Sequence, residues 1–309
     1  MIRSVRLKAY AKLNLGLRVL FKRPDDYHEL RTVFQTISLA DSLEMDYSPA
    51  RATSIEITGT PHITDNLVEK ASRLVLGALD IRAKLTFRLK KLIPAGAGLG
   101  GGSSDAAAVL LALPVLAGKH LKPEELHRLA TDLGSDVPFF LQGGTALGLG
   151  RGEELYPLPE RSATKGLLIT PNIHSGTAEA YRDLSSRLTT ISLQNKLFSF
   201  QQEVWQSSDR VMQNDFEDGV FTRFPELRRI AARLVRSGAR PVAMTGSGSS
   251  VFGIVSDPAR LPQARKAFPG EQVFEISFVS RSQYRSAFRR ALKLHTKGDL
   301  WPPRSRYAR

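Results

Sequence analysis

The residues best suited to chemistry lie in a glycine-rich stretch at 94–108, which reads PAGAGLGGGSSDAAA. Its five glycines let the backbone approach a ligand closely and adopt positive φ angles. Ser103, Ser104 and Asp105 follow the glycines, and we expect them to act as N-cap residues for a helix over 106–113. A helix start offers unpaired N–H groups and a partial positive charge. The stretch therefore predicts an anion site, most often a phosphate site.

Four interpretations of this loop can be compared, and a missing lysine excludes the first. A Walker A loop needs Gly-x-x-x-x-Gly-Lys-Ser/Thr, but Gly102 stands where the lysine belongs. Gly96, Gly98 and Gly101 fit the spacing of a dinucleotide fingerprint, yet no clear strand ending in an acidic residue follows. The third interpretation is a loop that binds a nucleoside triphosphate without a lysine of its own. The fourth is a plain helix-capping turn.

A strand and a turn near the N-terminus carry further candidate groups. Residues 7–20 alternate apolar and polar side chains, which predicts a strand with Lys12 and Asn14 on one face. That face is either solvated or part of a site. Tyr27 and His28 follow a turn at 24–26 and are either surface residues or partners that stack on and hydrogen-bond a planar ring.

A lone carboxylate lies further along the chain. Asp136 stands between Ser135 and an apolar, proline-containing turn at 137–140. It directly follows a helix that we expect over 123–133, with Gly134 as its C-cap. A carboxylate in that setting is either a structural cap or a catalytic group.

Composition limits the class of protein. The 309 residues can bury a substantial core, arranged as two domains. There is no cysteine, which excludes disulfides, thiolate catalysis and Cys-based zinc sites, and the six histidines lack metal-ligand spacing. No apolar run approaches the roughly 20 residues of a membrane helix. No signal peptide precedes the first strand pattern, so we expect a cytoplasmic protein.

The net charge is +14, which invites a nucleic-acid interpretation. However, residues 281–309 hold nine Lys or Arg against Asp299 alone, so this tail carries +8 of the total. The remainder is mildly basic, as expected of an enzyme with anionic substrates. We expect the tail to be helical to about residue 294 and disordered at its end.

The other elements follow from periodicity and turn residues. Expected strands lie at 32–39, 42–47, 54–58, 145–149, 166–170, 241–245, 251–255 and 273–279. Expected helices lie at 67–79, 178–184 and 225–237, with helices and loops over 192–220. The small-residue turn at 246–250 is either a plain hairpin or a closure against the glycine-rich loop.

Together these stretches resemble the GHMP kinase superfamily, whose members phosphorylate small metabolites with ATP. The motifs at 11–15, 94–104 and 245–250 carry the resemblance. The runs at 23–30 and 135–140 look most like the branch that phosphorylates the 2-hydroxyl of 4-diphosphocytidyl-2-C-methyl-D-erythritol, in the non-mevalonate isoprenoid pathway. One departure is Asp26, which replaces the family's usual glycine before Tyr27 and tolerates a left-handed backbone.

The resemblance implies an α+β fold of two domains. The N-terminal domain, at 1–155, would be like ribosomal S5 domain 2 and hold the phosphate loop. The C-terminal domain, at 156–285, would be a ferredoxin-like α/β unit, followed by a basic tail at 286–309. The active site would lie between the domains.

The resemblance also assigns roles to residues. Lys12 and Asp136 would be the catalytic pair. The implied substrate contacts are Asn14, Tyr27, His28, Thr177, Tyr181, Gly246 and Ser247. The implied ATP contacts are Asn66, Pro94, Ala95, Gly96, Ala97, Gly98, Leu99, Gly100, Gly101, Gly102, Ser103 and Ser104. ATP and Mg²⁺ would be the cofactors, with Ser104 a candidate neighbour of the metal and no preformed protein metal site. The partners would be small molecules, not nucleic acid or membrane.

Two alternatives remain. The nearest is another GHMP kinase, of homoserine or mevalonate type, against which Tyr27, His28 and Tyr181 argue because only a planar base requires them. The other is a basic nucleic-acid-binding module that reuses this fold. It would leave Lys12, Asp136 and the intact loop unexplained, and it predicts a steep salt dependence of RNA binding.

Overall fold

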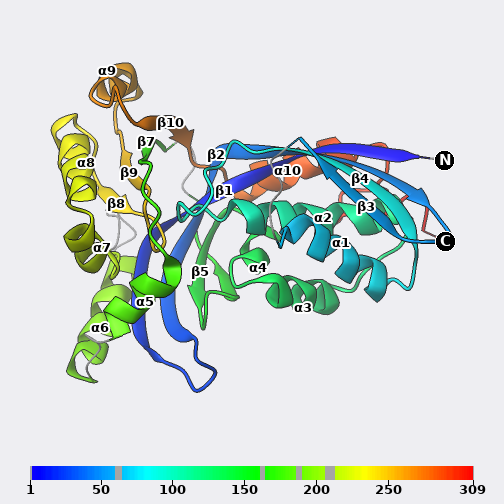
Figure 1. Cartoon of the computed structure of the whole chain (residues 1–309), viewed down its shortest axis with the longest axis horizontal. Coiled ribbons are helices and arrows are strands. Elements are labelled where there is room, and N and C mark those ends of the chain that lie inside the picture. Colours follow the sequence, from blue (N-terminus) through cyan, green and yellow to red (C-terminus); the bar gives the residue numbers. More distant parts are fainter. Residues whose placement is uncertain (1, 60–64, 161–163, 186–189, 206–212, 309) are drawn as a thin grey trace.

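Two β-sheets lie side by side along the long axis of the molecule, and a long hairpin of the first sheet reaches the second half (Figure 1). The structure is a computed structural model, and it describes residues 2–59, 65–160, 164–185, 190–205 and 213–308. In the described part of the chain, no helix has the length and apolar character needed to span a membrane.

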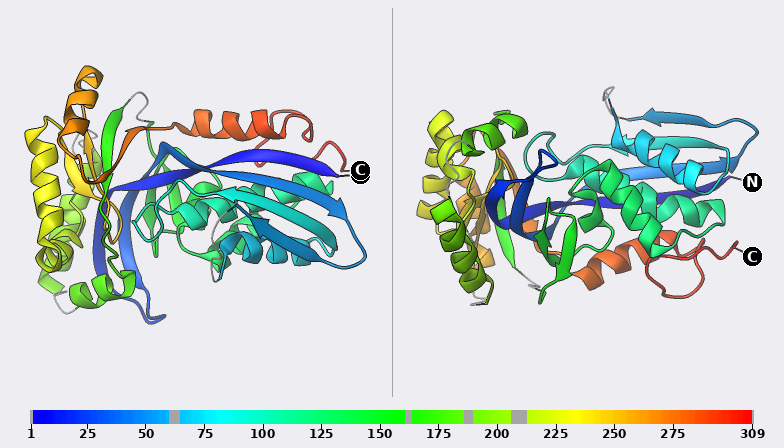
Figure 2. Two further views of the ribbon diagram at one scale, coloured as in Figure 1. Left: turned by 45° about the horizontal axis from the view of Figure 1, so that its top comes forward. Right: turned by 90° about the horizontal axis from the view of Figure 1, so that it is seen from below.

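The first sheet has six strands in the order β3-β4-β2-β5-β6, with β1 paired to β2. Its strands are β1 (Arg3–Lys22), β2 (His28–Pro49), β3 (Ser54–Thr58), β4 (Ala83–Lys90), β5 (Thr145–Leu149) and β6 (Glu154–Pro157). All neighbours are antiparallel except β3 and β4. The helices α1 (Leu67–Ala78), α2 (Gly101–Ala117), α3 (Pro123–Leu133) and α4 (Val137–Phe140) gather on one face of this sheet (Figure 2).

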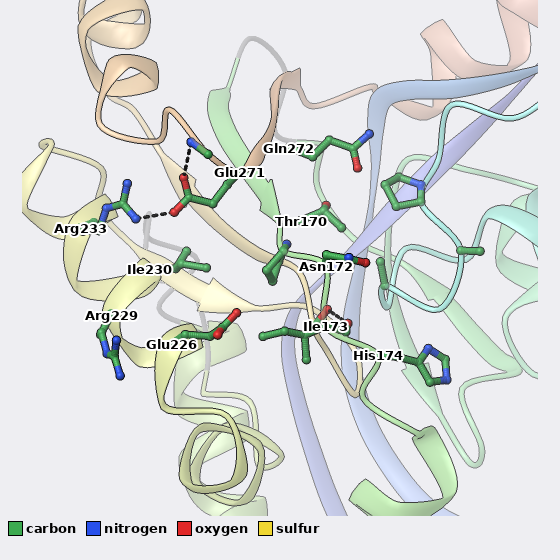
Figure 3. Close-up of a pocket in the computed structure, with 16 residues that line it drawn as sticks. Thr170, Asn172, Ile173, His174, Glu226, Arg229, Ile230, Arg233, Glu271 and Gln272 are labelled. Atoms are coloured by element: carbon green, nitrogen blue, oxygen red, sulfur yellow. Dashed lines mark hydrogen bonds and ion pairs between the residues drawn. The ribbon is translucent and has the colours of Figure 1, made fainter.

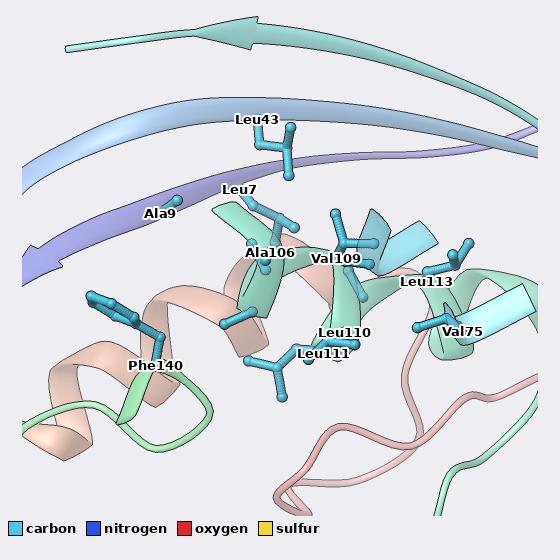
Figure 4. Packing of buried hydrophobic residues seen from close by; sticks show 14 of the residues in the cluster. Leu7, Ala9, Leu43, Val75, Ala106, Val109, Leu110, Leu111, Leu113 and Phe140 are labelled. Carbon is cyan, nitrogen blue, oxygen red and sulfur yellow. The ribbon is translucent and has the colours of Figure 1, made fainter. Parts of the chain in front are cut away.

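Helix α2 is the centre of the first core. It is apolar on every side, which is typical of a fully buried helix, and its residues from Ser104 to Leu116 are buried. Leu7 and Leu43 pack on it from the sheet, Val75 from α1 and Phe140 from α4 (Figure 4). This packing fixes the start of α2, where the glycine-rich loop ends.

The second sheet has four strands in the order β10-β7-β9-β8, with every neighbouring pair antiparallel. Its strands are β7 (Lys165–Thr170), β8 (Val242–Met244), β9 (Val251–Ile254) and β10 (Gln272–Ser277). The order is that of a ferredoxin-like unit, in which helical segments follow the first and third strands. These segments comprise α5 (Thr177–Ser185), α6 (Thr190–Trp205), α7 (Glu217–Arg223), α8 (Pro225–Arg236), the 3₁₀ turn η1 (Pro258–Arg260) and α9 (Leu261–Lys266).

The hairpin of β1 and β2 joins the two halves. Leu17 pairs with Asn214, and Ile37 pairs with Phe278, so the hairpin pairs with two separate segments of the second half. Leu13 of β1 shares a buried cluster with Phe252 of β9. The hairpin therefore fixes how the two sheets face each other.

Several sequence predictions are confirmed and three are wrong. The helix at 123–133 and the strand at 145–149 have the predicted bounds. The strands expected at 32–39 and 42–47 are instead one strand, β2. Asp41, which lies between the two expected strands, is buried and accepts the backbone N–H groups of Leu92 and Ile93. Residues 40–41, which the sequence prediction left outside both strands, are therefore part of β2.

The start of α2 also differs from the prediction. The helix begins at Gly101, and its N-cap is Gly100, at φ 68° and with no side-chain cap bond. Ser103, Ser104 and Asp105 therefore lie inside the helix and do not cap it. Glycine makes this early start possible because it adopts the left-handed conformation without steric cost.

The end of the chain is ordered, contrary to the prediction. Helix α10 (Arg281–Leu292) packs on the first core through Tyr284, Phe288 and Leu292. Beyond it, Trp301 donates a hydrogen bond to the carbonyl oxygen of Leu141, and Ser305 donates one to that of Val115. The predicted domain boundary at 155 falls inside β6, the last strand of the first sheet, and remains a prediction.

Candidate active site

A cavity of about 1120 Å³ opens between the two halves, beside the hairpin of β1 and β2. Nearly all the site residues expected from the sequence line it. They are Lys12, Asn14, Tyr27, His28, Pro94, Ala95, Gly96, Ala97, Gly98, Leu99, Gly100, Gly101, Gly102, Ser103, Asp136, Thr177, Tyr181, Gly246 and Ser247. Asn66 and Ser104 do not line it. Asn66 is the N-cap of α1 and accepts the N–H of Val68.

Lys12 and Asp136 form an ion pair in this cavity, with 3.3 Å between Nζ and Oδ2. Lys12 lies on β1, just past a register shift, and its side chain is 5% exposed. Asp136 is the N-cap residue of α4 but makes no side-chain cap bond, and its side chain is 33% exposed. The carboxylate is therefore open to a ligand on one side and held by a cation on the other.

Asn14 fixes the position of the lysine. Its Oδ1 accepts a hydrogen bond from Lys12 Nζ at 2.6 Å, and its Nδ2 donates to Thr32 at 2.8 Å. Its backbone N–H donates to the hydroxyl of Thr245 at 3.0 Å. Asn14 thereby connects the catalytic candidates to both halves of the molecule, and its contact with substrate remains a prediction.

The glycine-rich loop lies against the turn after β8. A Cβ atom at Gly98 would lie 3.1 Å from the carbonyl carbon of Thr245 and nearer still to its oxygen. The hydroxyl of Thr245 donates to the carbonyl oxygen of Gly98 at 3.3 Å. The turn is therefore both the hairpin between β8 and β9 and a closure against the loop. Gly96, Gly98 and Gly100 all have positive φ angles, from 65° to 78°.

The start of α2 faces the cavity with free donors. Gly101, Gly102 and Ser103 line the cavity, and the first N–H groups of a helix have no intrahelical acceptor. The positive end of the helix dipole lies at the same place. Backbone donors and dipole together suit a phosphate chain.

Aromatic side chains form the other end of the cavity. The Tyr181 ring stacks on the imidazole of His28, with 4.8 Å between centroids and 29° between planes. Phe216 packs edge-on against the same tyrosine. Burial raises the pKa of Tyr181, and burial followed by the charge of Lys22 lowers the pKa of His28. Both groups are thus held neutral, which suits recognition of an uncharged ring.

Tyr27 lies apart from this stack. Its ring is 52% exposed, and the guanidinium of Arg151 lies 4.6 Å from the ring centroid. The preceding Asp26 has a φ of 65°, so it takes the left-handed conformation expected of it. The contact of Tyr27 with the substrate remains a prediction.

A buried ionic cluster, not foreseen from the sequence, supports the loop. Lys91 donates to Asp41 and, at 2.7 Å, to Asp105 of α2. Burial raises the pKa of Asp105 to about 7, against the opposing charge of Lys91. The cluster joins β2, the strand end before the loop and the first turns of α2. No local pattern in the sequence indicates that Asp41, Lys91 and Asp105 are partners.

A second cavity, of about 850 Å³, shares Pro94, Ala95 and Ala97 of its lining with the first, and Figure 3 draws its side chains. Glu226, Arg229 and Arg233 of α8 line it, together with Glu271 and His174. Arg233 is paired with Glu271. This cavity contains neither Lys12 nor Asp136, so the first cavity is the candidate active site.

Comparison with protein families identifies the class. The model of the GHMP kinase N-terminal domain matches residues 66–144, which include the glycine-rich loop and Asp136. The model of the GHMP kinase C-terminal domain matches residues 199–273, which include the turn after β8. The protein is thus a GHMP kinase, and this class of enzyme uses ATP.

Curated relatives narrow the class further. A 4-diphosphocytidyl-2-C-methyl-D-erythritol kinase of Solibacter usitatus is 52% identical over 99% of this chain and 98% of its own length. The enzyme of the same name from Geobacillus kaustophilus is 36% identical over 88% of this chain and 96% of its own. The chain belongs to the family of 4-diphosphocytidyl-2-C-methyl-D-erythritol kinases.

Solved structures agree with this assignment. The crystal structure of a 4-(cytidine 5'-diphospho)-2C-methyl-D-erythritol kinase has a TM-score of 0.73 and 34% identity, over 90% of this chain and 99% of that one. A homoserine kinase from Cytophaga hutchinsonii has a TM-score of 0.70 at 19% identity, over 91% and 96% of the two chains. At that identity the second match shows the fold alone.

Proposed function

We propose that the protein transfers the γ-phosphoryl group of ATP to the 2-hydroxyl of 4-diphosphocytidyl-2-C-methyl-D-erythritol, a step of isoprenoid biosynthesis in the cytoplasm. The observation that carries the proposal is the ion pair of Lys12 and Asp136, which lies in one cavity with the glycine-rich loop and the Tyr181–His28 stack. Family membership supports the choice of substrate.

Phosphoryl transfer depends mainly on positioning and on stabilisation of charge. In the proposed mechanism, Asp136 accepts the proton of the attacking hydroxyl. Lys12 stabilises the negative charge that develops on the transferred group. Asn14 holds the ammonium of Lys12 in place through its 2.6 Å hydrogen bond. The N–H groups at the start of α2 hold the phosphates of ATP.

The residues around the loop also fit a magnesium ion. Ser104 Oγ and Asp105 Oδ1 are buried and have no hydrogen-bond partner within the described chain. Hard oxygen ligands of this kind suit Mg²⁺, which usually binds through one or two protein groups and the phosphates of its nucleotide. Ser104 would hold the ion, and the ion would neutralise charge on the phosphates.

The aromatic end of the cavity suits the cytosine. Its ring can stack on an aromatic face, and its edge can bond to the neutral imidazole of His28. Stacking of this kind contributes about 1 kcal/mol beyond burial. Tyr181 would supply one face of the sandwich and Tyr27 the other. Thr177 and Ser247, whose hydroxyls lie 3.0 Å apart, would contact the substrate between the two halves.

The test is a coupled assay of ADP release with three alcohols at equal concentration. We expect turnover with the cytidyl substrate and a kcat/KM at least a hundredfold lower with homoserine and with mevalonate. A preference for homoserine or mevalonate would replace the proposed substrate but leave the kinase assignment intact. A steep salt dependence of RNA binding with no ADP release would contradict the kinase proposal itself.

A further inference from the structure

The helix that carries Asp136 has carbonyl groups that its own turn cannot satisfy. Helix α4 is one turn long, from Val137 to Phe140, and the last carbonyls of a helix lack intrahelical partners. The carbonyl oxygen of Phe139 accepts the backbone N–H groups of Gln142 and Gly143. The carbonyls of Phe140 and Leu141 depend on other donors.

The C-terminal segment supplies those donors. The hydroxyl of Tyr284, on α10, donates to the carbonyl oxygen of Phe140. The indole Nε1–H of Trp301 donates to that of Leu141 at 3.0 Å. Neither residue lines the active-site cavity. Both bonds thus join the end of the chain to the C-terminal end of α4.

The ring of Tyr284 packs closely against the turn that follows α4. A Cβ atom at Gly143 would lie 2.7 Å from Cδ1 of Tyr284, so only glycine lets the ring approach there. Tyr284 is fully buried, and burial raises the pKa of its hydroxyl, which keeps the proton for donation. Trp301 packs edge-on against Tyr284 and Phe288, with centroid distances of 6.4 and 6.0 Å.

We propose that Tyr284 and Trp301 are positioning residues that hold α4, and through it Asp136, at the correct distance from Lys12. This inference rests on the proposed role of Asp136 as base. Only about 7.5 Å of helix axis separates Asp136 from Leu141, at about 1.5 Å per residue. A shift at one end of so short and fully buried a helix therefore reaches the other.

The consequence is an effect on turnover with little effect on binding. A displacement of about 1 Å at a catalytic group can lower the rate about a hundredfold. Phe140 of α4 lies against Gly100 of the glycine-rich loop, but the variants leave this side chain in place, so we expect the affinities for ATP and the cytidyl substrate to change far less than turnover. A purely structural role would instead change stability alone.

The test compares the variants Tyr284→Phe, Trp301→Phe and their combination with Ser305→Ala. Each aromatic change removes one hydrogen-bond donor and keeps most of the ring volume. Ser305 is the matched control, because it lies in the same terminal segment and donates to a backbone carbonyl, that of Val115 at 2.7 Å. That carbonyl lies at the far end of α2. The readouts are kcat, the two KM values and Tm.

We expect the double variant to lose at least tenfold in kcat, with both KM values within twofold of wild type. Ser305→Ala should show a comparable fall in Tm and an unchanged kcat. An unchanged kcat in the double variant, or an equal loss in Ser305→Ala, would overturn the inference. If the double variant does not fold, the single variants are judged by the same criteria. The proposed base is tested separately by Asp136→Asn, so the two ideas can fail independently.

Discussion

The substitution Gly98→Ala tests the contact between the two glycine-containing turns. A Cβ atom there would lie 3.3 Å from the carbonyl oxygen of Gly248 and 3.1 Å from the carbonyl carbon of Thr245. Both neighbours are backbone atoms, so neither can move aside alone. Gly98 also has a φ of 78°, which costs a residue with a Cβ about 1–2 kcal/mol. Forcing extra volume into a packed site adds about 1–3 kcal/mol.

We therefore expect Gly98→Ala to lower the free energy of unfolding by about 2–5 kcal/mol. Thr245 would have to shift, and it accepts the backbone N–H of Asn14, so the position of Lys12 would change as well. Denaturant unfolding without ligands measures the first effect. ADP release measures the second, which should appear as a fall in kcat.

Gly102→Ala is the matched control in the same stretch. Gly102 lies inside α2, and the nearest atom to its Cβ would be Leu67 Cδ1, at an ordinary 3.5 Å. Alanine is favoured over glycine in a helix by about 0.5–1 kcal/mol. This variant should unfold at the same denaturant concentration as wild type or a higher one. Equal destabilisation by the two substitutions, or none by Gly98→Ala, would refute the reasoning.

Two further predictions concern the substrate and the buried cluster. Tyr27→Ala should raise KM for the cytidyl substrate about fivefold, the equivalent of about 1 kcal/mol of stacking. The KM for ATP should stay unchanged. An unchanged KM for the cytidyl substrate would show that Tyr27 is not part of the cytosine site. Asp105 has its pKa raised from 3.8 to about 7, so ionisation in the folded state is disfavoured and wild-type stability falls as pH rises between these values. The unfolding free energy of wild type should therefore fall, relative to that of Asp105→Asn, by about 1.4 kcal/mol for each pH unit of increase in that window. A difference that is constant with pH would contradict the buried, raised-pKa carboxyl.

Local patterns in the sequence were sufficient for much of the fold. The helix at 123–133 has a proline at its first turn and a glycine after its end, and both signals act within a few residues. The helix start at Gly101 was predicted too late because serine and aspartate are common caps, whereas here the left-handed Gly100 ends the loop. Cap preference is a local average that a tight loop geometry overrides.

The contacts missed from the sequence are those between distant segments. Asp41 and Lys91 are fifty positions apart, and Tyr284 and Phe140 are 144 apart. Neither pair leaves a periodic signal, because a contact between segments so far apart does not follow a local repeat. The end of the chain was predicted to be disordered because termini usually are, yet Trp301 there donates a hydrogen bond to the carbonyl oxygen of buried Leu141.

Lys12, Asn14 and Asp136 show what the sequence can predict about the site. The alternation in β1 correctly indicated that Lys12 and Asn14 share a face, since their side chains are hydrogen-bonded. The 3.3 Å approach of Lys12 to Asp136 depends on packing of α4 against β2 and α2, which no local pattern contains. Their roles in catalysis remain predictions.

The substitution Asp136→Asn tests the central claim most directly. It keeps the shape of the side chain and removes its ability to accept a proton as a base. We expect kcat for the cytidyl substrate to fall at least a thousandfold, while calorimetry shows ATP bound with wild-type affinity and Tm changes little. Turnover within tenfold of wild type, in a variant that binds ATP normally, would contradict the role of Asp136 as the catalytic base.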